Sequence, residues 1–509
     1  MSEANHIPTA GKNLELPLHE SSPINIPNLK ISAEQDDDAS PCLPNTPPPT
    51  PETSNIPTPP APKLPPTPPS YLTTSFIQTA LRTKHPNIVV TNLNLVPAVG
   101  SGENYVTIVF RAAVETNEGP FHLILKCIPE TEHRAKMANE NGLTEREMRF
   151  YKKVLPIYEQ FLPGDDHPTR PTTPFCYYTI KQGLVDVIVL KDLKPDGYRT
   201  ANRHLGLDKQ HCELAFTELA KLHALSIKFR IENPELFEKE IAMEFKENLY
   251  VERNRELFNV FLENAVKNVA KGIRDNFPYR YHSLTPTMEL VSTKGFQMML
   301  EMLQVGDDEL NDRILVLSHG DFWSNNMLFQ YDSPESKIPK NCCTLDFQLG
   351  RCGSPITDLI YFLFSSTTKL TRMQHIDYLL KLYFDQVYVK LEHLNIHKPL
   401  PKNMFYTSMK ELKEDFKKYI LYGLFISIFI MPVVVADAED APDMENINED
   451  DLSASVEQFN CLYQTPRFIN RFKGVLDDCD DLGLFVDLQK LLVKEGAEEV
   501  LVNGESIPE

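Results

Sequence analysis

The chain has 509 residues and carries 71 acidic against 51 basic side chains, which gives a formal net charge of −20 at pH 7. This balance excludes a nucleic-acid partner, because a phosphate backbone requires a basic surface. The length exceeds what one hydrophobic core usually serves, so we expect two lobes and some unstructured sequence, while 42% hydrophobic residues are typical of a soluble globular protein.

The sequence was next searched for a secretory signal, a membrane span and cysteine patterns. The opening MSEANHIPTAGKNLE lacks the basic end and apolar run of a secretory signal. The longest apolar run, residues 420–436, is marginal for a membrane span, and we interpret it as a buried core helix that ends near Pro432. Nine cysteines without repeated zinc-ligand spacing are interpreted as free thiols, so we expect a cytoplasmic protein with no membrane span.

Residues 1–74 are predicted to form a disordered, proline-rich tail. Between Pro41 and Pro69, 14 of 29 positions are proline, and such a segment has too little apolar surface to offset the entropy cost of folding. We expect an extended, partly polyproline II chain. Residues 62–65 fit the PxxP pattern, and two interpretations stay open: a solvated linker, or a docking segment for an SH3-type domain or a proline-directed kinase.

Residues 75–190 are predicted to form an N-terminal nucleotide-binding lobe in which an antiparallel sheet carries few helices. A short helix is expected at 75–81 and a longer one at 135–154. Alternating apolar residues bounded by turn residues predict five strands, at residues 91–99, 104–114, 121–128, 175–181 and 186–190.

Residues 191–485 are predicted to form a mainly helical C-terminal lobe, so the expected fold class is α+β. A β-hairpin of residues 326–331 and 342–347 interrupts the helices. The acidic stretch 437–451 is interpreted as a solvated loop, and residues 486–509 as an acidic helix with a fraying end. Six helices are expected from the apolar periodicity, at residues 208–230, 234–239, 250–276, 284–304, 374–392 and 408–435.

The segment HGDFWSNN, residues 319–326, carries the strongest chemical signal. Asp321 and Asn326 lie at opposite ends of one loop, and Asp346 follows the second hairpin strand, so all three should converge. Carboxylate and amide oxygens are the ligands that Mg²⁺ prefers, and Asp346 and Asn326 can supply them. The remaining carboxylate, Asp321, is then free to accept a hydroxyl proton. The pattern predicts phosphoryl transfer with Asp321 as base and Asn326 and Asp346 as metal ligands. Taken alone, the HGD sequence could form a turn with Asp321 as a helix cap, and Asp346 could simply end a strand. The joint pattern favours the functional interpretation.

The predicted sheet carries candidate phosphate-binding residues. Gly100 and Gly102 lie in a turn where bare backbone can approach phosphates, although glycines are common in β-turns. Lys126 lies on an apolar strand, where a lysine requires an anionic partner, and Glu147 can supply it. Together they would hold the α- and β-phosphates of ATP. The alternative for Glu147 is a capping box with Thr144.

The segment VIVLKDLKPDGYR, residues 187–199, connects the predicted sheet to the helical region. A strand that runs into Leu190, Lys191 and Asp192 would form a hinge whose backbone hydrogen-bonds adenine. A polar connector is the alternative interpretation.

Several motifs together resemble the ecdysteroid kinase-like family of insects, which carries the CHK kinase-like domain and is related to choline kinases and aminoglycoside phosphotransferases. The resemblance covers residues 75–485 and implies a bilobal, protein-kinase-like fold with ATP in the cleft. The motifs occur in the family's order: GENY, ExxFY, LKDLKPDGYR, LAKLHALS, HGDFWSNNMLF and LDFQLGRCGSPITDLIYFL.

The resemblance also implies ATP and Mg²⁺ as cofactors and assigns residue roles. Asp321 matches the catalytic base, and Asn326 and Asp346 match the Mg²⁺ ligands. Asp358 matches an acid that braces the backbone of the catalytic loop, and His319 matches a histidine that shapes it. The residues expected to bind the nucleotide are Gly100, Gly102, Asn104, Lys126, Glu147, Leu190 and Asp192.

One departure from the family pattern concerns the hinge, where Lys191 stands in place of the glutamate of LEDL; adenine is read mainly through backbone, so activity should survive.

The namesake substrates imply that the enzyme phosphorylates a hydroxyl of an ecdysteroid or a similar lipophilic metabolite or xenobiotic, which needs a large apolar pocket. Two alternatives stay open. One is a choline- or ethanolamine-type kinase with an aromatic cage. The other is a pseudokinase scaffold that recruits partners through its tail.

Overall fold

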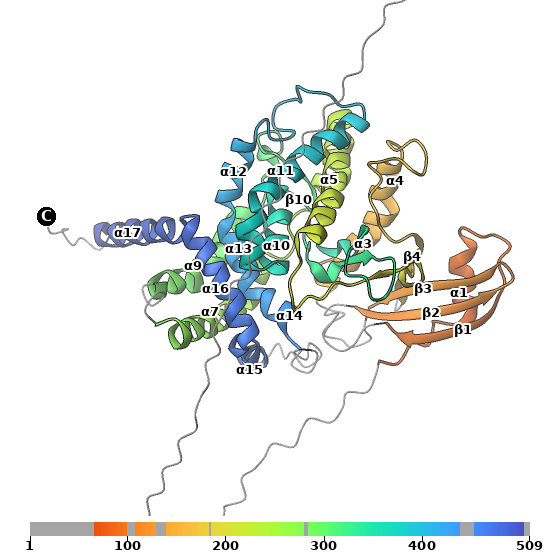
Figure 1. Cartoon of the computed structure of the whole chain (residues 1–509), viewed down its shortest axis with the longest axis horizontal. Helices are drawn as coiled ribbons and strands as arrows, with labels where there is room; N and C mark the ends of the chain where they lie inside the picture. Colours follow the sequence, from red (N-terminus) through yellow and green to blue (C-terminus); the bar gives the residue numbers. More distant parts are fainter. Residues whose placement is uncertain are drawn as a thin grey trace, which may run out of the picture. The chain divides into compact units, whose positions relative to one another are not determined.

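The structure, a computed structural model of the chain, describes residues 66–98, 107–128, 139–182, 185–278, 284–437 and 452–502 (Figure 1). They belong to one compact unit, Leu64–Glu509. The expected proline-rich tail up to residue 65 lies outside the described residues. Residues 438–451 of the acidic stretch also lie outside them.

The sheet lobe is an antiparallel sheet with the strand order β1-β2-β3-β5-β4. Alternation of apolar residues gives it one buried face, to which β2 contributes Phe110 and Val114 and β3 contributes Leu123 and Leu125. All five predicted strands are confirmed, with bounds that differ by a few residues: β1 (Val90–Pro97), β2 (Ile108–Thr116), β3 (Gly119–Cys127), β4 (Cys176–Gln182) and β5 (Val185–Lys191).

Helix α1 (Thr74–Arg82) covers this buried face (Figure 1). The helix begins where the side chain of Thr73 accepts a hydrogen bond from the amide of Phe76, and it packs Ile77 and Leu81 into the cluster of sheet side chains. The predicted short helix at residues 75–81 is therefore confirmed.

The longer helix predicted at residues 135–154 is interrupted by a turn at residues 141–142, and the part of the prediction before residue 139 lies outside the described residues. Helix α3 (Leu143–Arg149) follows Gly142, whose φ of 61° is left-handed, and it continues into the π-helical turn Phe150–Val154 and then α4 (Leu155–Glu159). Residues 129–138 lie outside the described ranges. Single π-helical turns occur often near functional sites, and this one lies one turn after Glu147.

The helical lobe holds most of the remaining elements. Asp208 caps its first long helix by accepting from the amide of His211, which confirms the predicted start. The described helices of this lobe are α5 (Lys209–Glu232), α6 (Pro234–Phe237), α7 (Arg255–Asn276), α9 (Thr285–Leu303), α10 (Ile356–Ser366), α11 (Lys369–His393), α12 (Met409–Lys418), α13 (Ile420–Phe429), α14 (Met431–Val435), α15 (Leu452–Glu457), α16 (Pro466–Asp481) and α17 (Leu484–Val502).

The single helix predicted at residues 408–435 is wrong, because the chain forms α12, α13 and α14 there. Breaks fall at Tyr419 and Ile430. Pro432 lies in the first turn of α14, where its missing N–H is tolerated, rather than at the end of the preceding helix.

Helices α10, α15 and α16 were not predicted. Every residue of α10 is buried, so its sequence has no polar face and no 3.6-residue periodicity. Helix α16 does carry a start signal, because Thr465 caps it by accepting from the amide of Phe468 and Pro466 follows at the first position.

The predicted hairpin is confirmed and gains a third strand. β8 (Met327–Gln330) pairs with β9 (Asn341–Thr344), and β6 (Tyr198–Arg199) pairs with the other edge of β8. A further short pair, β7 (Val316–Ser318) with β10 (Arg351–Gly353), joins the segment before residues 319–326 to the segment after Asp346. These pairings hold the motif-bearing segments together.

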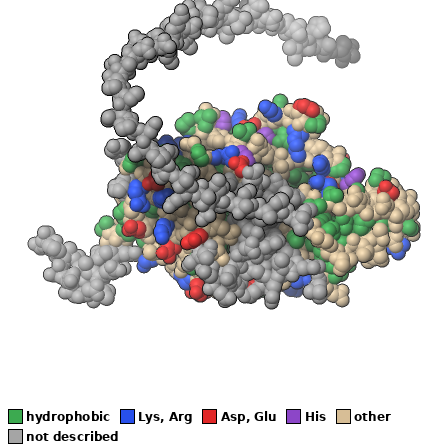
Figure 2. Space-filling model, turned by 90° about the horizontal axis from the view of Figure 1, so that it is seen from below, with side chains coloured by type: hydrophobic (Ala, Val, Ile, Leu, Met, Phe, Trp, Pro, Cys, Tyr) green, Lys and Arg blue, Asp and Glu red, His purple; other side chains and the backbone are tan. Residues whose placement is uncertain are grey.

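The predicted α+β class, an antiparallel sheet lobe followed by a mainly helical lobe, is confirmed. Within the described ranges, every helix falls short of the length and apolar character that a membrane crossing requires. On the face shown in Figure 2, acidic and basic side chains of the described residues lie interspersed. Seven described cysteines, at positions 127, 176, 212, 342, 343, 352 and 479, are free thiols.

Candidate active site

The HGD turn depends on a glycine. Gly320 has a φ of 79°, and a Cβ at this position would lie 1.8 Å from the carbonyl oxygen of Leu349. Only glycine combines this backbone conformation with such a close approach. The contact sets Asp321 directly beside the 3₁₀ turn Phe347–Leu349, which follows Asp346.

Asp358 braces this turn from α10. Its Oδ2 accepts from the amide of His319 at 2.7 Å, and its Oδ1 accepts from the amide of Gly320 at 2.9 Å. Burial acts to raise the pKa of Asp358, but hydrogen bonding from His223 and the nearby histidines hold the net pKa below its ordinary value. The carboxylate is therefore ionised and gives the HGD turn a fixed acceptor.

His319 joins the catalytic loop to the second hairpin strand. Its Nε2 lies 2.9 Å from the carbonyl oxygen of Leu345, which can only accept, so Nε2 carries the proton. Burial lowers the pKa of His319, and the ring is neutral. The amide of Leu345 donates in turn to the carbonyl oxygen of Asn326 at 2.9 Å. The segment that carries Asp346 is thus tied to both ends of the loop.

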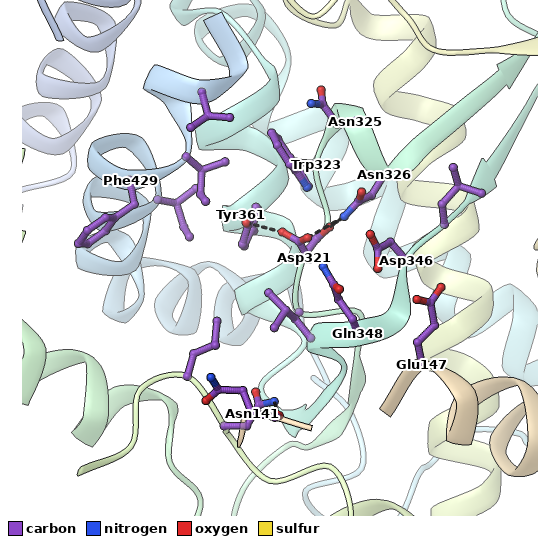
Figure 3. A pocket seen from close by; sticks show the side chains of 18 of the residues that line it. Asn141, Glu147, Asp321, Trp323, Asn325, Asn326, Asp346, Gln348, Tyr361 and Phe429 are labelled. Atoms are coloured by element: carbon purple, nitrogen blue, oxygen red, sulfur yellow. Dashed lines mark hydrogen bonds between the residues drawn. The ribbon is translucent and has the colours of Figure 1, made fainter. Parts of the chain in front are cut away.

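Both oxygens of Asp321 are bound inside the protein (Figure 3). Tyr361 Oη donates to Oδ1 at 2.5 Å, and Asn326 Nδ2 donates to Oδ2 at 2.7 Å. Burial raises the pKa of Asp321 to about 6, and the bonds from Tyr361 and Asn326 oppose that rise. The carboxyl is fixed in orientation and is mainly ionised at neutral pH.

Lys126, Glu147 and Asp346 form a buried charge cluster. The Nζ of Lys126 lies 2.5 Å from Glu147 Oε2 and 2.9 Å from Asp346 Oδ1. Burial acts to lower the pKa of Lys126, but the two carboxylates outweigh it and the net pKa is raised. Asp346 has a φ of 64°, a left-handed backbone conformation that costs a non-glycine residue energy and is found mainly at functional sites.

The capping-box alternative for Glu147 is wrong. Helix α3 begins at Leu143 with Gly142 as its N-cap, no side chain caps it, and Glu147 lies well inside it. The Glu147 side chain is 2% exposed and bonded to Lys126, as the pairing interpretation requires.

The segment after β5 has a bond that the sequence did not reveal. Asp192 Oδ2 accepts from Arg111 Nε at 2.5 Å, and the amide of Asp192 donates to the carbonyl oxygen of His122. The Lys191 side chain is exposed and pairs with Asp196 at 2.7 Å. Leu190 lies behind them in the wall of the cavity described next. The other expected nucleotide-binding residues, Gly100, Gly102 and Asn104, lie outside the described residues.

One cavity of about 820 Å³ joins these groups. At one end it is lined by Lys126, Glu147 and Asp346, and Asp321 lies in its wall. Beyond Asp321 the lining becomes largely apolar and comes from α7, α13, α14 and the segment before α16. The apolar residues of this end are Leu257, Phe258, Phe261, Ile426, Phe429, Ile430, Val433, Phe459 and Tyr463.

Among the cavity residues that the sequence analysis did not single out are Tyr361, Gln348 and Tyr422. Tyr361 had a detectable signal, because it lies three residues after Asp358 and so on the same face of one helix. The lone tryptophan, Trp323, also lines the cavity, with its indole close to Asp321 (Figure 3).

Comparison with solved structures finds kinases of small molecules. A wild-type aminoglycoside 2′-phosphotransferase-IIIa in its GDP complex is 12% identical, covering 77% of this chain and 98% of that chain, with a TM-score of 0.34. A Plasmodium vivax ethanolamine kinase is 11% identical, covering 74% of this chain and 83% of that chain, with a TM-score of 0.33. At these values the likeness carries no inference about activity. Comparison with curated proteins finds no match.

The family assignment rests on the sequence match. The model of the ecdysteroid kinase-like family matches residues 101–396, which is more than half of the chain and contains Lys126, Glu147, Asp321, Asn326, Asp346 and Asp358. The family expected from the motifs is confirmed: the chain belongs to the ecdysteroid kinase-like family.

Proposed function

We propose that the protein is an ATP- and Mg²⁺-dependent kinase that phosphorylates a hydroxyl group of a lipophilic small molecule, such as an ecdysteroid or a similar hydroxylated metabolite or xenobiotic. One observation carries the proposal. Asp321, a carboxylate with fixed orientation, lies where the charged end of a single cavity gives way to an apolar end.

The charged end offers groups that fit a nucleotide and its metal. Lys126, oriented by Glu147, would bind the α- and β-phosphates. Asn326 uses its Nδ2 on Asp321, so its Oδ1 is the atom left for a metal, and Asp346 supplies a carboxylate. Mg²⁺ bound there would neutralise phosphate charge. Leu190 and the backbone near Asp192 would contact the adenine.

Asp321 has the geometry of a general base. As the acceptor oxygen bonds to the γ-phosphorus of ATP, its proton passes to the Asp321 carboxylate, and ADP leaves with the electron pair of the broken P–O bond. Tyr361 and Asn326 keep the carboxylate aimed at the cavity. His319 and Asp358 hold the loop without touching the reacting atoms.

The apolar end supports a lipophilic acceptor. Its wall combines aromatic side chains such as Phe258 and Phe429 with the aliphatic Ile426 and Val433, which suits a broad hydrocarbon surface. A choline-type substrate would need carboxylates gathered with aromatic rings around a small cation. Glu247 and Glu256 line the cavity near Tyr250 and Phe258, so choline is the competing acceptor to test.

An acceptor screen tests the proposal. Purified protein with Mg·ATP should release ADP in the presence of an ecdysteroid or another hydroxylated lipophile, and not with choline or ethanolamine. Turnover with choline and with no lipophilic acceptor would contradict the proposal and indicate a choline- or ethanolamine-type kinase. A chain that Mg·ATP stabilises in thermal unfolding, but that turns over no acceptor, would instead be a pseudokinase.

A further inference from the structure

Gln348 is a buried polar side chain to which the proposed function gives no role. It lies in the 3₁₀ turn Phe347–Leu349, two residues after Asp346, and it lines the cavity. It is 8% exposed. Its carboxamide makes no hydrogen bond to any residue that the structure describes, and it points toward Asp321 (Figure 3).

Most buried polar groups in folded proteins are paired within the protein. The Gln348 carboxamide borders the cavity instead, so water or a ligand there must complete its hydrogen bonds. The turn holds the side chain in this position. The ring of Phe347 stacks on Phe150 with centroids 3.6 Å apart, and the carbonyl oxygen of Leu349 packs against Gly320.

Two other donors near Asp321, Arg351 and Lys126, are already committed, whereas the indole Nε1 of Trp323 has no hydrogen-bond partner among the described residues. Arg351 donates to Tyr422 Oη and to the carbonyl oxygen of Gly320, and it pairs with Glu247. Lys126 lies between its two carboxylates. Gln348 is thus an available donor between Asp346, on the phosphate side, and Asp321, on the acceptor side.

We propose that the Gln348 carboxamide N–H donates a hydrogen bond to a non-bridging oxygen of the transferring phosphoryl group. The inference rests on the proposed function. In the transfer, the acceptor oxygen bonds to phosphorus, the bond to the bridging oxygen of ADP breaks with its electron pair, and the acceptor proton goes to Asp321. Gln348 neither gains nor loses a proton; it stabilises charge that grows during the transfer.

A transition-state mimic tests this without knowledge of the acceptor. Calorimetry would measure the affinity of the full chain for Mg·ADP, alone and with aluminium fluoride, whose planar complex occupies the phosphoryl position. Wild-type protein should bind Mg·ADP more tightly with fluoroaluminate. Gln348→Met keeps the side-chain length, and it should weaken binding of the fluoroaluminate complex on the order of 10²-fold while leaving Mg·ADP affinity unchanged.

Two comparisons make the result specific. Gln348→Glu removes the donor and adds repulsion, so its loss should exceed that of Gln348→Met. Gln330→Met makes the same exchange on β8, where the side chain donates to the carbonyl oxygen of Asp196, and it should leave both affinities at wild-type values. Thermal unfolding of each variant reports whether the fold is intact.

Each remaining outcome is decisive. Equal fluoroaluminate affinity in wild type and Gln348→Met overturns the role of Gln348, as does an equal loss of Mg·ADP and fluoroaluminate binding. A wild type that binds Mg·ADP but gains nothing from fluoroaluminate overturns the Gln348 proposal alone. A wild type that binds no Mg·ADP overturns the proposed function as well.

Discussion

At the charged end of the cavity Lys126, Glu147 and Asp321 are held by short polar contacts, whereas the apolar end is made of side chains that only pack. Lys126 and Glu147 are 2.5 Å apart, and Tyr361 and Asp321 are also 2.5 Å apart. Directed bonds fix positions to fractions of an ångström, and packing fixes only a shape. We therefore expect substitutions at the first end to stop the chemistry and substitutions at the second to change which acceptor is used.

The largest effect is expected at the base. Asp321→Asn keeps the size of the side chain but cannot take a proton, so kcat should fall by about 10³-fold or more, since general-base catalysis contributes roughly 10²–10⁴-fold. Affinity for Mg·ATP should stay near wild type in calorimetry, because Asp321 faces the acceptor side. A variant with more than a tenth of wild-type kcat would exclude Asp321 as the base.

Removal of the buried lysine should destabilise the fold itself. Lys126→Met leaves Glu147 and Asp346 buried without their cation, and breaking a buried ion pair costs roughly 3–5 kcal/mol. Urea unfolding should record this loss, together with loss of Mg·ATP binding. Adding Glu147→Gln removes one stranded charge and should restore part of the stability; equal stability of the single and double variants would contradict this explanation.

Alanine substitutions at two glycines can separate the cost of a left-handed backbone conformation from the cost of a steric clash. Gly320→Ala places a Cβ 1.8 Å from a backbone oxygen, whereas Gly164→Ala, at a similar φ of 85°, meets nothing within 4 Å. The left-handed conformation alone costs about 1–2 kcal/mol. Thermal unfolding should therefore show a clearly larger loss for Gly320→Ala, with loss of turnover; equal losses would mean that the loop can yield.

The charged end could be predicted from sequence because its residues lie in short, linked segments. Asp321, Asn326 and Asp346 are joined by one hairpin, and Lys126 and Glu147 lie on consecutive elements. Alternation and turn residues likewise predicted all five strands of the sheet lobe. The bond from Tyr361 and the position of Gln348 depend on how α10 and the 3₁₀ turn pack, which no local pattern specifies.

The apolar end could not be predicted, because it is assembled from distant segments. Helices α7, α13 and α14 contribute to one wall, yet their apolar residues look like ordinary core residues in the sequence. The division of residues 408–435 into three helices, which sets the direction of Phe429 and Val433, was also missed. Sequence patterns therefore indicated the reaction more readily than the acceptor.

A change at the apolar end should affect the acceptor alone. Phe429 is half-buried and lines the cavity (Figure 3). Phe429→Ala should raise the KM for a lipophilic acceptor about tenfold, since covering an aromatic side chain is worth roughly 1.5–3 kcal/mol. The KM for ATP should not change. An equal rise in both constants, measured by ADP release, would mean that the two ends of the cavity are coupled.

The smallest effect is expected at the hinge, where the chain departs from its family. Lys191 lines the cavity, but its side chain is 43% exposed and pairs with Asp196, and exposed pairs contribute about 0–1 kcal/mol. Lys191→Glu restores the family's residue and should change the KM for ATP by less than about twofold, because adenine would be read through the backbone beside Leu190. Arg111→Gln is the informative contrast, since it removes the 2.5 Å bond to Asp192 that holds this backbone to the sheet. If Lys191→Glu proves the more damaging of the two, the hinge side chain itself contacts the nucleotide, and the charged end extends further than its directed bonds indicate.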